Sequence, residues 1–535
     1  MKNSTLASPI YFNVAEYCLF GIIVGVIVAI ILYFNVINRK YSTVAGFLFG
    51  GKNMSIFNIS LALIASHLTS ITLLGVPVEI YLRGTQYWAS ALSLILVTFL
   101  TAVIYLPVFH KLQLSSSFEY LEIRFSTHTR TIAAVLFVVS KLMLLPIVPY
   151  VPLLAFRLVT EPLAGRVTAV ICVVCATFTA VGGLQAIVSI GMLTFFLSLV
   201  GTALPTGLAL LPMGFKRMWE IASHGERLVL YDPDPELAHH TSFFAVTLAI
   251  STNWLWKVAL SQSSLQKLLA VPTISKARIC LAISCIGVIL MKLLSCLLGL
   301  ALYAWFAGCD PLMSGQIKRH EQLLCILVGA YCAGVVWCSK ELDRLQHVAS
   351  GVTGVTAGTL LGLFTLGIVF SRANCSGALS GCLLSLLLCG WLLIGAENAL
   401  ATGALTFQGK HLATTGCGKA NFTHAFSNIS SSLPSAVNQL PTKPLQSLFR
   451  ISFTYCPFAG VISVLLIGVP MSYLTGKSRT DSMNPDVFCP LTQSFLHKSP
   501  MRSPTISLEV CPPDTQEVYE ALDEALKHLK EVIDR

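Results

Sequence analysis

The sequence contains few charged residues: Asp, Glu, Lys and Arg make up only 11% of its 535 positions. Soluble domains carry about a quarter charged residues, so this scarcity excludes a soluble globular protein. The chain also lacks a basic stripe with interleaved aromatic residues. Its formal net charge of +10 is therefore no sign of nucleic-acid binding, and we interpret it through the basic residues that collect in cytoplasmic loops of membrane proteins.

Motifs of enzymes and metal centres are missing as well. There is no HExxH helix, no nucleophile elbow and no phosphate-binding loop. His239-His240 and His320-Glu321 lack the partners that a metal site or a proton-transfer site requires. No CxxC or Cys/His spacing stands out among the 17 cysteines, many of which lie inside apolar runs. We therefore predict that the protein is not an enzyme and has no cofactor.

Long apolar runs are abundant instead. Hydrophobic residues make up 55% of the chain, and the mean hydropathy is +0.74. A run of about 20 apolar residues crosses a bilayer of about 30 Å, so the pattern predicts an all-α polytopic membrane protein. The predicted spans are Ala15–Ile37, Ile56–Leu74, Tyr87–Phe109, Ile132–Phe156, Val167–Val181, Ile187–Leu211, Phe243–Leu260, Ile279–Phe306, Leu323–Cys338, Val348–Phe370, Gly377–Gly395 and Phe453–Tyr473.

The stretch Gly50–Gly84 does not have the sequence of an uninterrupted span. Polar residues crowd the middle of its apolar run, and Gly75 and Pro77 then interrupt it. A membrane helix tolerates a break only beside protein or a water-filled cavity. Secondary transporters use such broken helices to expose carbonyl oxygens to a cation. The alternative is a packed span whose hydroxyl groups bond to its own backbone. The polar residues are Ser66, His67, Thr69, Ser70 and Thr72.

Polar segments predict the domain organisation. Residues 1–14, with a glycosylation sequon at Asn3, form an extracellular N-terminus, and residues 15–475 form the transmembrane domain. Within this domain, the Ser- and Asn-rich residues 398–450 suit an extracellular loop, since they carry sequons at Asn421 and Asn428. Residues 476–535 form a cytoplasmic tail. The last part of the tail, Asp514–Arg535, has the pattern of an amphipathic helix.

Ionisable residues inside predicted spans are costly and are therefore candidates for function. Lys257 and Glu397 lie near span ends, from which a side chain can reach the membrane surface. Lys141 and Lys292 instead interrupt the middle of their apolar runs. His67 lies in the polar middle of the central span, where it contacts either an anion or a backbone carbonyl.

Several motifs resemble those of one family in the same order along the chain. Gly50-Gly-Lys-Asn-Met-Ser resembles the GG-x-x-M-S signature of the sodium:solute symporters, and Ser117-Phe-Glu-Tyr-Leu-Glu-Ile-Arg-Phe resembles their YEYLELRF loop. Thr179-Ala-Val-Gly-Gly-Leu-Gln-Ala is similar to TAxGGLKA, and Gln262–Thr273 is similar to NQxxVQRYLAxPT. The resemblance covers about residues 10–475. Within the family, Leu63–Tyr81 is most similar to the branch of monocarboxylate, multivitamin and iodide transporters, and the chain resembles its insect-type members.

This resemblance implies a LeuT-like core of two inverted five-helix repeats. The substrate is then expected near mid-membrane between two broken helices, here the central span and Phe243–Leu260. The resemblance maps two sodium-binding carbonyls onto Ala65 and Leu68. It also places Cys309 and Cys417 outside, where they can form a disulfide bond. The candidates for the substrate pocket are His67, Thr69, Thr72 and Gln262.

The chain departs from the family pattern after Cys309-Asp-Pro-Leu. An eighth core helix with serine-rich spacing is expected there, but the chain runs directly into Leu323–Cys338, which is similar to the ninth. The second repeat is therefore expected to be incomplete. Twelve full crossings would put the tail outside, against Lys477 and Arg479. Either Leu323–Cys338 fails to span and eleven crossings remain, or the protein is misfolded and retained.

The resemblance leads to two functional hypotheses. The first is sodium-coupled symport of a small organic anion across the plasma membrane: a monocarboxylate, a vitamin such as biotin or pantothenate, or iodide. Its partners would be sodium as the coupling ion, the substrate and membrane lipid, with no nucleic acid. The alternative is a non-transporting or regulatory family member, or a truncated isoform without sodium coupling, retained in the endoplasmic reticulum.

Overall fold

The computed structural model describes residues 14–33, 49–52, 54–69, 71–145, 164–229, 231, 243, 245–308, 342–401, 455–476 and 484–496. These residues form helices and the turns between them, with no strand in the described part. The chain divides into two compact units, Met1–Thr492 and Gln493–Arg535, and every membrane helix described belongs to the first. The prediction of an all-α polytopic fold is confirmed.

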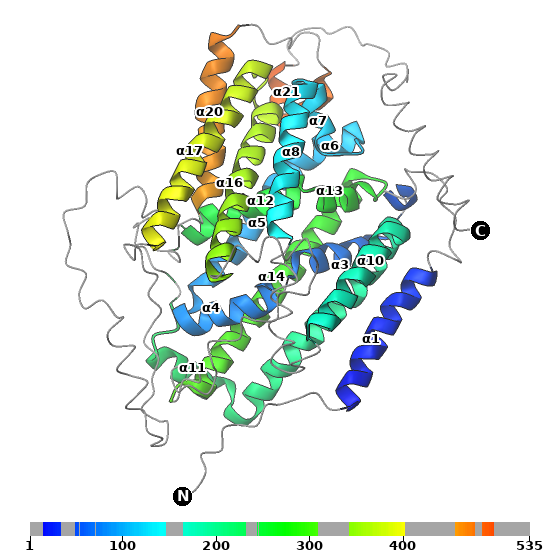
Figure 1. Cartoon of the computed structure of the whole chain (residues 1–535), viewed down its shortest axis with the longest axis vertical. Coiled ribbons are helices and arrows are strands. Elements are labelled where there is room, and N and C mark those ends of the chain that lie inside the picture. The colour runs from blue at the N-terminus through cyan, green and yellow to red at the C-terminus, as the bar shows by residue number, and fades with distance from the viewer. Residues whose placement is uncertain are drawn as a thin grey trace, which may run out of the picture. The chain divides into compact units, whose positions relative to one another are not determined.

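The elements follow one another along the chain in Figure 1. They are α1 (Val14–Leu32), η2 (Gly50–Lys52), α3 (Ile56–His67), η3 (Ile71–Gly75), α4 (Val76–Arg83), η4 (Thr85–Ala89), α5 (Ser90–Leu100), η5 (Thr101–Tyr105), α6 (Leu106–Leu112), α7 (Glu119–Arg124), α8 (Thr127–Leu144), α10 (Ala164–Met213), α11 (Phe215–His224), η7 (Ala245–Ala249), α12 (Ile250–Leu255), η8 (Trp256–Leu260), α13 (Gln262–Leu269), α14 (Ile274–Phe306), α16 (Leu342–Val369), α17 (Cys375–Ala401), α20 (Cys456–Leu474), η12 (Pro485–Val487) and α21 (Pro490–Leu496).

Seven helical stretches of the described residues are long and apolar enough to cross a membrane, and the bent pair of α3 and α4 makes an eighth. Most boundaries lie within a few residues of the predicted ones. The predicted spans Val167–Val181 and Ile187–Leu211 form one helical run, α10, with a kink at Gly183. Gly183 has a φ of 58°, which is accessible to glycine because it lacks a Cβ atom. The predicted span Leu323–Cys338 lies outside the described residues.

The break in the central span lies earlier than predicted. α3 ends at His67, where Leu68 has extended backbone angles (φ −87°, ψ 102°), and the helix axis then turns by 65°. Gly75 and Pro77 do not interrupt the helix, because η3 continues directly into α4. Pro77 lies in the first turn of α4, where a missing N–H group costs little. The polar residues, and not the Gly/Pro pair, therefore mark the break.

The predicted span Phe243–Leu260 was also expected to be broken, and this expectation is wrong for the described part, Ala245–Leu260. Here two π-helical turns, η7 and η8, flank the short α12 without a gap. Ala249 and Trp256, at the two junctions, keep right-handed helical angles. π-Helical turns are rare and frequently occur at functional sites. The helix is thus distorted where a break was expected.

Basic residues at one end of the helices indicate how the chain is expected to be oriented in the membrane. Lys111 lies in the last turn of α6, Arg124 ends α7, and Arg278 lies in the first turns of α14. α6 and α7 lie at the upper end of Figure 1 and α11 at the opposite end. Since basic residues collect on the cytoplasmic side, we expect the upper end to be the cytoplasmic one. α20 ends there too, because Asn374 Nδ2, in the turn between α16 and α17, donates to Thr475 Oγ1 at 2.8 Å.

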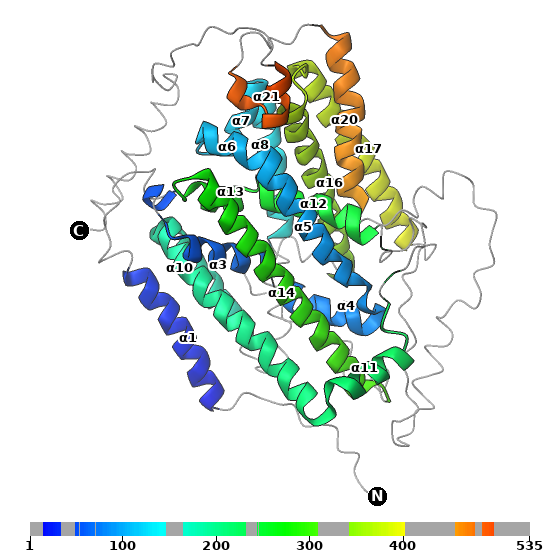
Figure 2. The same ribbon diagram turned by 180° about the vertical axis from the view of Figure 1, so that it is seen from behind.

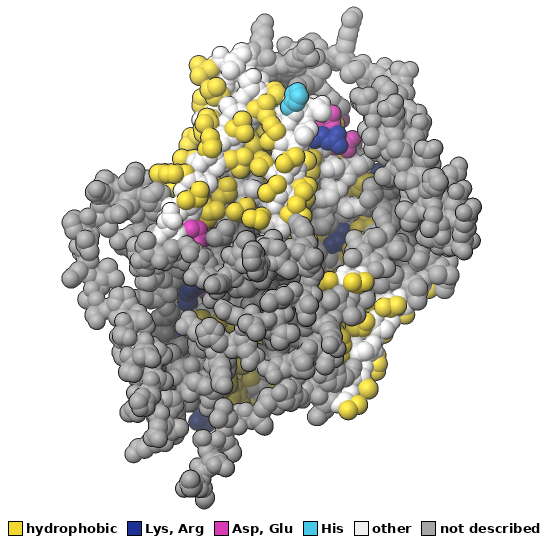
Figure 3. Space-filling view, viewed as in Figure 1, with side chains coloured by type: hydrophobic (Ala, Val, Ile, Leu, Met, Phe, Trp, Pro, Cys, Tyr) yellow, Lys and Arg dark blue, Asp and Glu magenta, His cyan; other side chains and the backbone are white. Residues whose placement is uncertain are grey.

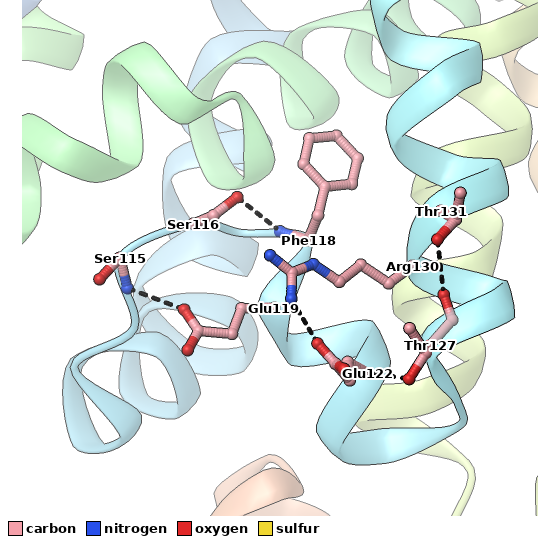
Figure 4. A network of polar contacts seen from close by, with 8 residues as sticks. All are labelled: Ser115, Ser116, Phe118, Glu119, Glu122, Thr127, Arg130 and Thr131. Atoms are coloured by element: carbon pink, nitrogen blue, oxygen red, sulfur yellow. Dashed lines mark hydrogen bonds and ion pairs between the residues drawn. The ribbon is translucent and has the colours of Figure 1, made fainter. Parts of the chain in front are cut away.

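The loop between α6 and α8 is held by a polar network (Figure 4). Arg130 forms an ion pair with Glu122, and Thr127 Oγ1 donates a hydrogen bond of 3.0 Å to Glu122 Oε1. The Arg130 guanidinium in particular holds the pKa of the Glu122 carboxyl below its ordinary value. The Ser115 N–H donates to Glu119 Oε2 at 3.1 Å. This part of the motif that resembles YEYLELRF thus fixes the turn between two membrane helices.

The outer faces of several helices are apolar. On α17, Leu387 and Ile394 keep 70% and 65% of their surface exposed, and Leu466 on α20 keeps 69%. Hydrophobic side chains gather over these helices in the space-filling view (Figure 3). Exposed apolar surface of this extent is stable in lipid and not in water. The protein is a multi-pass membrane protein.

Glycines allow α16, α17 and α20 to pack closely, and Gly358 is the most sensitive of those on α16. A Cβ atom at Gly358 would lie 2.2 Å from the carbonyl oxygen of Pro457 on α20, which is backbone and cannot rotate away. We expect Gly358→Ala to destabilise the protein by at least about 1–3 kcal/mol, the usual cost of overpacking. Thermal unfolding of the detergent-purified protein measures this effect.

The matched control is Gly201→Ala on α10, where no atom lies within 4 Å of the added Cβ. We expect this variant to unfold at the wild-type temperature or slightly above it, because alanine favours helix more than glycine does. Equal unfolding temperatures for both variants would contradict the close packing of α16 against α20.

Candidate functional site

α14 crosses both halves of the broken span, as Figure 2 shows. A Cβ atom at Gly287 would lie 2.3 Å from Ile64 Cδ1 on α3, and one at Gly299 would lie 2.7 Å from the Pro77 carbonyl oxygen on α4. Lys292 lies between these two contacts along α14, and therefore at the level of the break. Its side chain is only 2% exposed.

The buried ammonium group of Lys292 is held by polar and aromatic groups. Its Nζ donates a hydrogen bond of 3.0 Å to Ser90 Oγ at the start of α5. It also lies 4.7 Å from the ring centroid of Trp254 and 5.1 Å from that of Tyr87. Cation–π contacts of this kind contribute about 2 kcal/mol when they are desolvated. Within the described residues, none of the three ion pairs involves Lys292.

Trp254 on α12 is the residue around which these elements meet. The His67 ring, at the end of α3, lies edge-on to the indole with ring centroids 5.5 Å apart. Lys257 Nζ on η8 lies 5.6 Å from the same indole ring. The indole therefore joins the break in the central span, the distorted helix η7–α12–η8 and α14. These are the first helices of the two predicted repeats and the long helix that packs beside them.

Two amide groups next to these aromatic residues have polar atoms without a hydrogen-bond partner among the described residues: Gln86 Nε2, beside Tyr87, and Asn253 Oδ1, beside Trp254. Gln86 is only 5% exposed. Buried polar atoms are usually satisfied, so these two atoms are available to a ligand.

The break brings together most of the predicted pocket residues. Thr69 Oγ1 and Thr72 Oγ1 lie 3.4 Å apart within it, and His67 directly precedes it. The carbonyl of Ala65 accepts a hydrogen bond of 3.2 Å from the Leu68 N–H, so the predicted sodium ligands lie at the end of α3. Ser66 Oγ donates to the Leu63 carbonyl at 2.8 Å, as the packed alternative required.

Gln262 has a different role from the other pocket candidates. Its Nε2 donates to the Ser115 carbonyl at 2.8 Å, and its Oε1 accepts from the Ser117 N–H at 3.0 Å. The side chain therefore binds the loop between α6 and α7. The sequence reasoning missed Trp254, Tyr87 and Ser90, although an amide residue directly precedes each of the first two. These Gln-Tyr and Asn-Trp pairs were the sequence signal from which the site residues could have been found.

The remaining predicted sites lie outside the described residues. They are the sequons at Asn3, Asn421 and Asn428, the cysteines Cys309 and Cys417, and the helix Asp514–Arg535.

A membrane protein with a helix broken at mid-depth beside a buried cationic and aromatic cluster has the architecture of a secondary transporter. The sequence model of the sodium:solute symporter family matches residues 47–322, and the chain belongs to this family. The protein is a sodium-coupled symporter of small organic substrates and not an enzyme, with sodium as its coupling ion.

Relatives that match most of this chain support its assignment to the sodium-coupled symporters. Sodium-coupled monocarboxylate transporter 2 of Homo sapiens is 27% identical, over 90% of this chain and 88% of that protein. The putative sodium-dependent multivitamin transporter of Drosophila melanogaster is 26% identical, over 71% and 75%. The solved substrate-bound, outward-open structure of a Na+-coupled sialic acid symporter matches with a TM-score of 0.62 and 16% identity, over 87% of this chain and 98% of that chain. The predicted LeuT-like fold is confirmed.

The human relative is longer than this chain within the aligned region. The alignment extends over 552 positions but includes only 90% of the 535 residues, which is about 480. About 70 aligned positions therefore have no counterpart here. The family match also ends at residue 322, directly before the point where the sequence passes from an expected eighth core helix to Leu323–Cys338.

Proposed function

We propose that the protein imports a small organic anion together with sodium across the plasma membrane. Lys292 carries this proposal: its ammonium group is buried at the level of the break and has no ion-pair partner among the described residues. A buried charge is costly unless it is paired, and a carboxylate forms strong, charge-assisted hydrogen bonds with an ammonium group. A bound organic anion would compensate this charge and accept a hydrogen bond from the unsatisfied Gln86 Nε2.

Uptake of labelled organic anions tests this function. Oocytes or proteoliposomes that contain the full chain would be given butyrate and pantothenate in sodium medium and in choline medium. We expect uptake that sodium stimulates and that an unlabelled organic anion reduces. Sodium-stimulated uptake of a neutral solute, with no effect of organic anions, would contradict the proposal.

The proposed sodium site uses the carbonyl oxygens of Ala65 and Leu68. α3 ends between these residues, and the carbonyls at the C-terminal end of a helix carry partial negative charge that favours a cation. Among the described residues, no backbone N–H outside the helices donates to the Leu68 carbonyl. Because the helix axis bends by 65° here, the carbonyls at the break do not continue the regular hydrogen-bond pattern of a helix. This geometry resembles the way in which unwound helices hold sodium in transporters.

A pair of substitutions tests this sodium site. We expect Ser66→Pro to abolish sodium-dependent uptake, because proline in the last turn of α3 removes an N–H group and displaces the carbonyls before the break. Leu68→Ile keeps the backbone and is expected to retain at least half of the uptake. Uptake as a function of sodium concentration, at matched surface expression, is the measurement. Equal losses in the two variants would count against carbonyl coordination here.

The proposed topology has eleven crossings and a cytoplasmic tail. Its support is that α20, whose last residues contact Asn374, ends at the same end of the helices as α6 with its basic residue Lys111. We expect Asn421 and Asn428 to carry glycans, seen as a gel shift after glycosidase treatment and lost in the Asn→Gln variants. A C-terminal epitope is expected to bind antibody only after the cells are permeabilised. An epitope accessible on intact cells would refute this topology.

A further inference from the structure

Two lysines share one indole ring at the site. Lys292 Nζ lies 4.7 Å and Lys257 Nζ 5.6 Å from the ring centroid of Trp254, so the two ammonium groups are at most about 10 Å apart. They come from different elements, α14 and η8. Lys292 is buried against Ser90 and Tyr87, whereas the Lys257 side chain keeps exposed surface. Within the described residues, neither lysine takes part in an ion pair.

The charges at this site favour more than one negative group on the substrate. The two lysines contribute two positive charges when both are protonated, and a sodium-coupled protein must admit at least one further cation during each cycle. A substrate with one carboxylate would leave most of this charge uncompensated in a region of low dielectric constant, where repulsion between like charges is strong. A substrate with two carboxylates would pair with both lysines at once.

We infer that the site accepts a short dicarboxylate in preference to a monocarboxylate. This inference rests on the proposed function, because it concerns the same site. One carboxylate binds Lys292 Nζ and Ser90 Oγ, the second binds Lys257 Nζ, and the methylene groups between them lie over the Trp254 indole. A hydrogen bond of about 2.8 Å to each ammonium group leaves at most about 5 Å between the two carboxylate groups, which fits a diacid of about four carbons. Lys257 is thereby a residue that determines specificity.

Succinate and succinamate are the probes that test this inference. They have nearly the same size and shape, but a neutral amide replaces one carboxylate in succinamate. Each is tested as a competitor of labelled butyrate uptake and as a labelled substrate, with the full chain in sodium medium. We expect half-inhibition by succinate at a concentration at least about tenfold lower than by succinamate, which corresponds to about 1.4 kcal/mol.

Variants of Lys257 connect the preference to this residue. In Lys257→Gln the ratio between the two competitors is expected to fall to near one. Lys257→Arg keeps the charge and is expected to keep a preference for succinate. Surface labelling and a wild-type elution profile in detergent confirm that each variant folds.

Each outcome separates the two proposals. Butyrate uptake with equal inhibition by succinate and succinamate overturns the dicarboxylate inference and leaves anion symport intact. A succinate preference that survives in Lys257→Gln also overturns it, because the second carboxylate then binds elsewhere. Sodium-stimulated uptake of a neutral solute, with no effect of butyrate, succinate or succinamate, overturns both proposals.

Discussion

Replacing Lys292 by glutamine is expected to reduce sodium-dependent uptake of organic anions by roughly 10- to 100-fold. The variant keeps a hydrogen-bond donor near Ser90 but removes the charge that would bind the carboxylate. Hydrogen bonds to charged groups are worth about 1.5–3 kcal/mol, which gives this range. Initial rates of uptake over a series of substrate concentrations, corrected for surface expression, provide the measurement.

The stability of the same variant distinguishes binding from folding. Removing a buried charge relieves its desolvation cost, so we expect Lys292→Gln to unfold at or above the wild-type temperature. The control is Lys276→Gln, an exposed lysine in the first turn of the same helix, α14, which should leave uptake unchanged. Normal uptake in Lys292→Gln would remove the basis of the proposed function. A lower unfolding temperature together with lost uptake would assign the lysine to structure.

Replacing Arg124 by alanine is expected to destabilise the protein by roughly 3 kcal/mol or more, because several buried carbonyls lose their donor. The side chain is 1% exposed, and its Nε donates to the Gly367 carbonyl at 3.0 Å. Its Nη2 donates to the carbonyls of Phe370 and Ser371 at 3.0 and 3.1 Å. The guanidinium thus satisfies the C-terminal end of α16, whose last carbonyls have no partner within the helix.

Arg124 also joins parts of the chain that are distant in sequence. Its guanidinium carbon lies 4.9 Å from the ring centroid of Phe488, and the hydroxyl of Tyr120, on the same α7, donates to the Val487 carbonyl at 3.2 Å. Lys111 on α6 forms an ion pair of 3.1 Å with Asp486. The segment after the last membrane helix is therefore attached to the cytoplasmic end of α16 through α6 and α7.

Thermal unfolding in detergent and surface expression measure the effect of Arg124→Ala. We expect Arg124→Lys to be almost as damaging, since one ammonium group cannot reproduce the planar set of donors of a guanidinium. Arg130→Ala is the matched control: its ion pair with Glu122 is partly exposed, and such pairs contribute about 0–1 kcal/mol. Equal stability of the alanine variants at positions 124 and 130 would contradict the assigned role of Arg124.

Much of the fold could be predicted from the local sequence. Apolar runs predicted the membrane helices to within a few residues, because the bilayer requires about 20 apolar residues wherever a helix crosses it. A break in the central span was expected, with the interruption at Gly75 and Pro77, but it lies at the polar residues that precede them. Proline is tolerated in the first turn of a helix, so its presence alone does not mark an interruption.

The sequence by itself determined the class of the protein, the broken central span and the unusual lysine at position 292, since each follows from composition or from the cost of charge in a membrane. Only the tertiary structure decided which residues surround that lysine. Ser90 is separated from it by 202 positions, and Trp254 lies on a third helix. The tertiary structure also assigned Gln262 to a loop contact. Such pairs depend on how helices pack, and packing brings together residues that no local pattern relates.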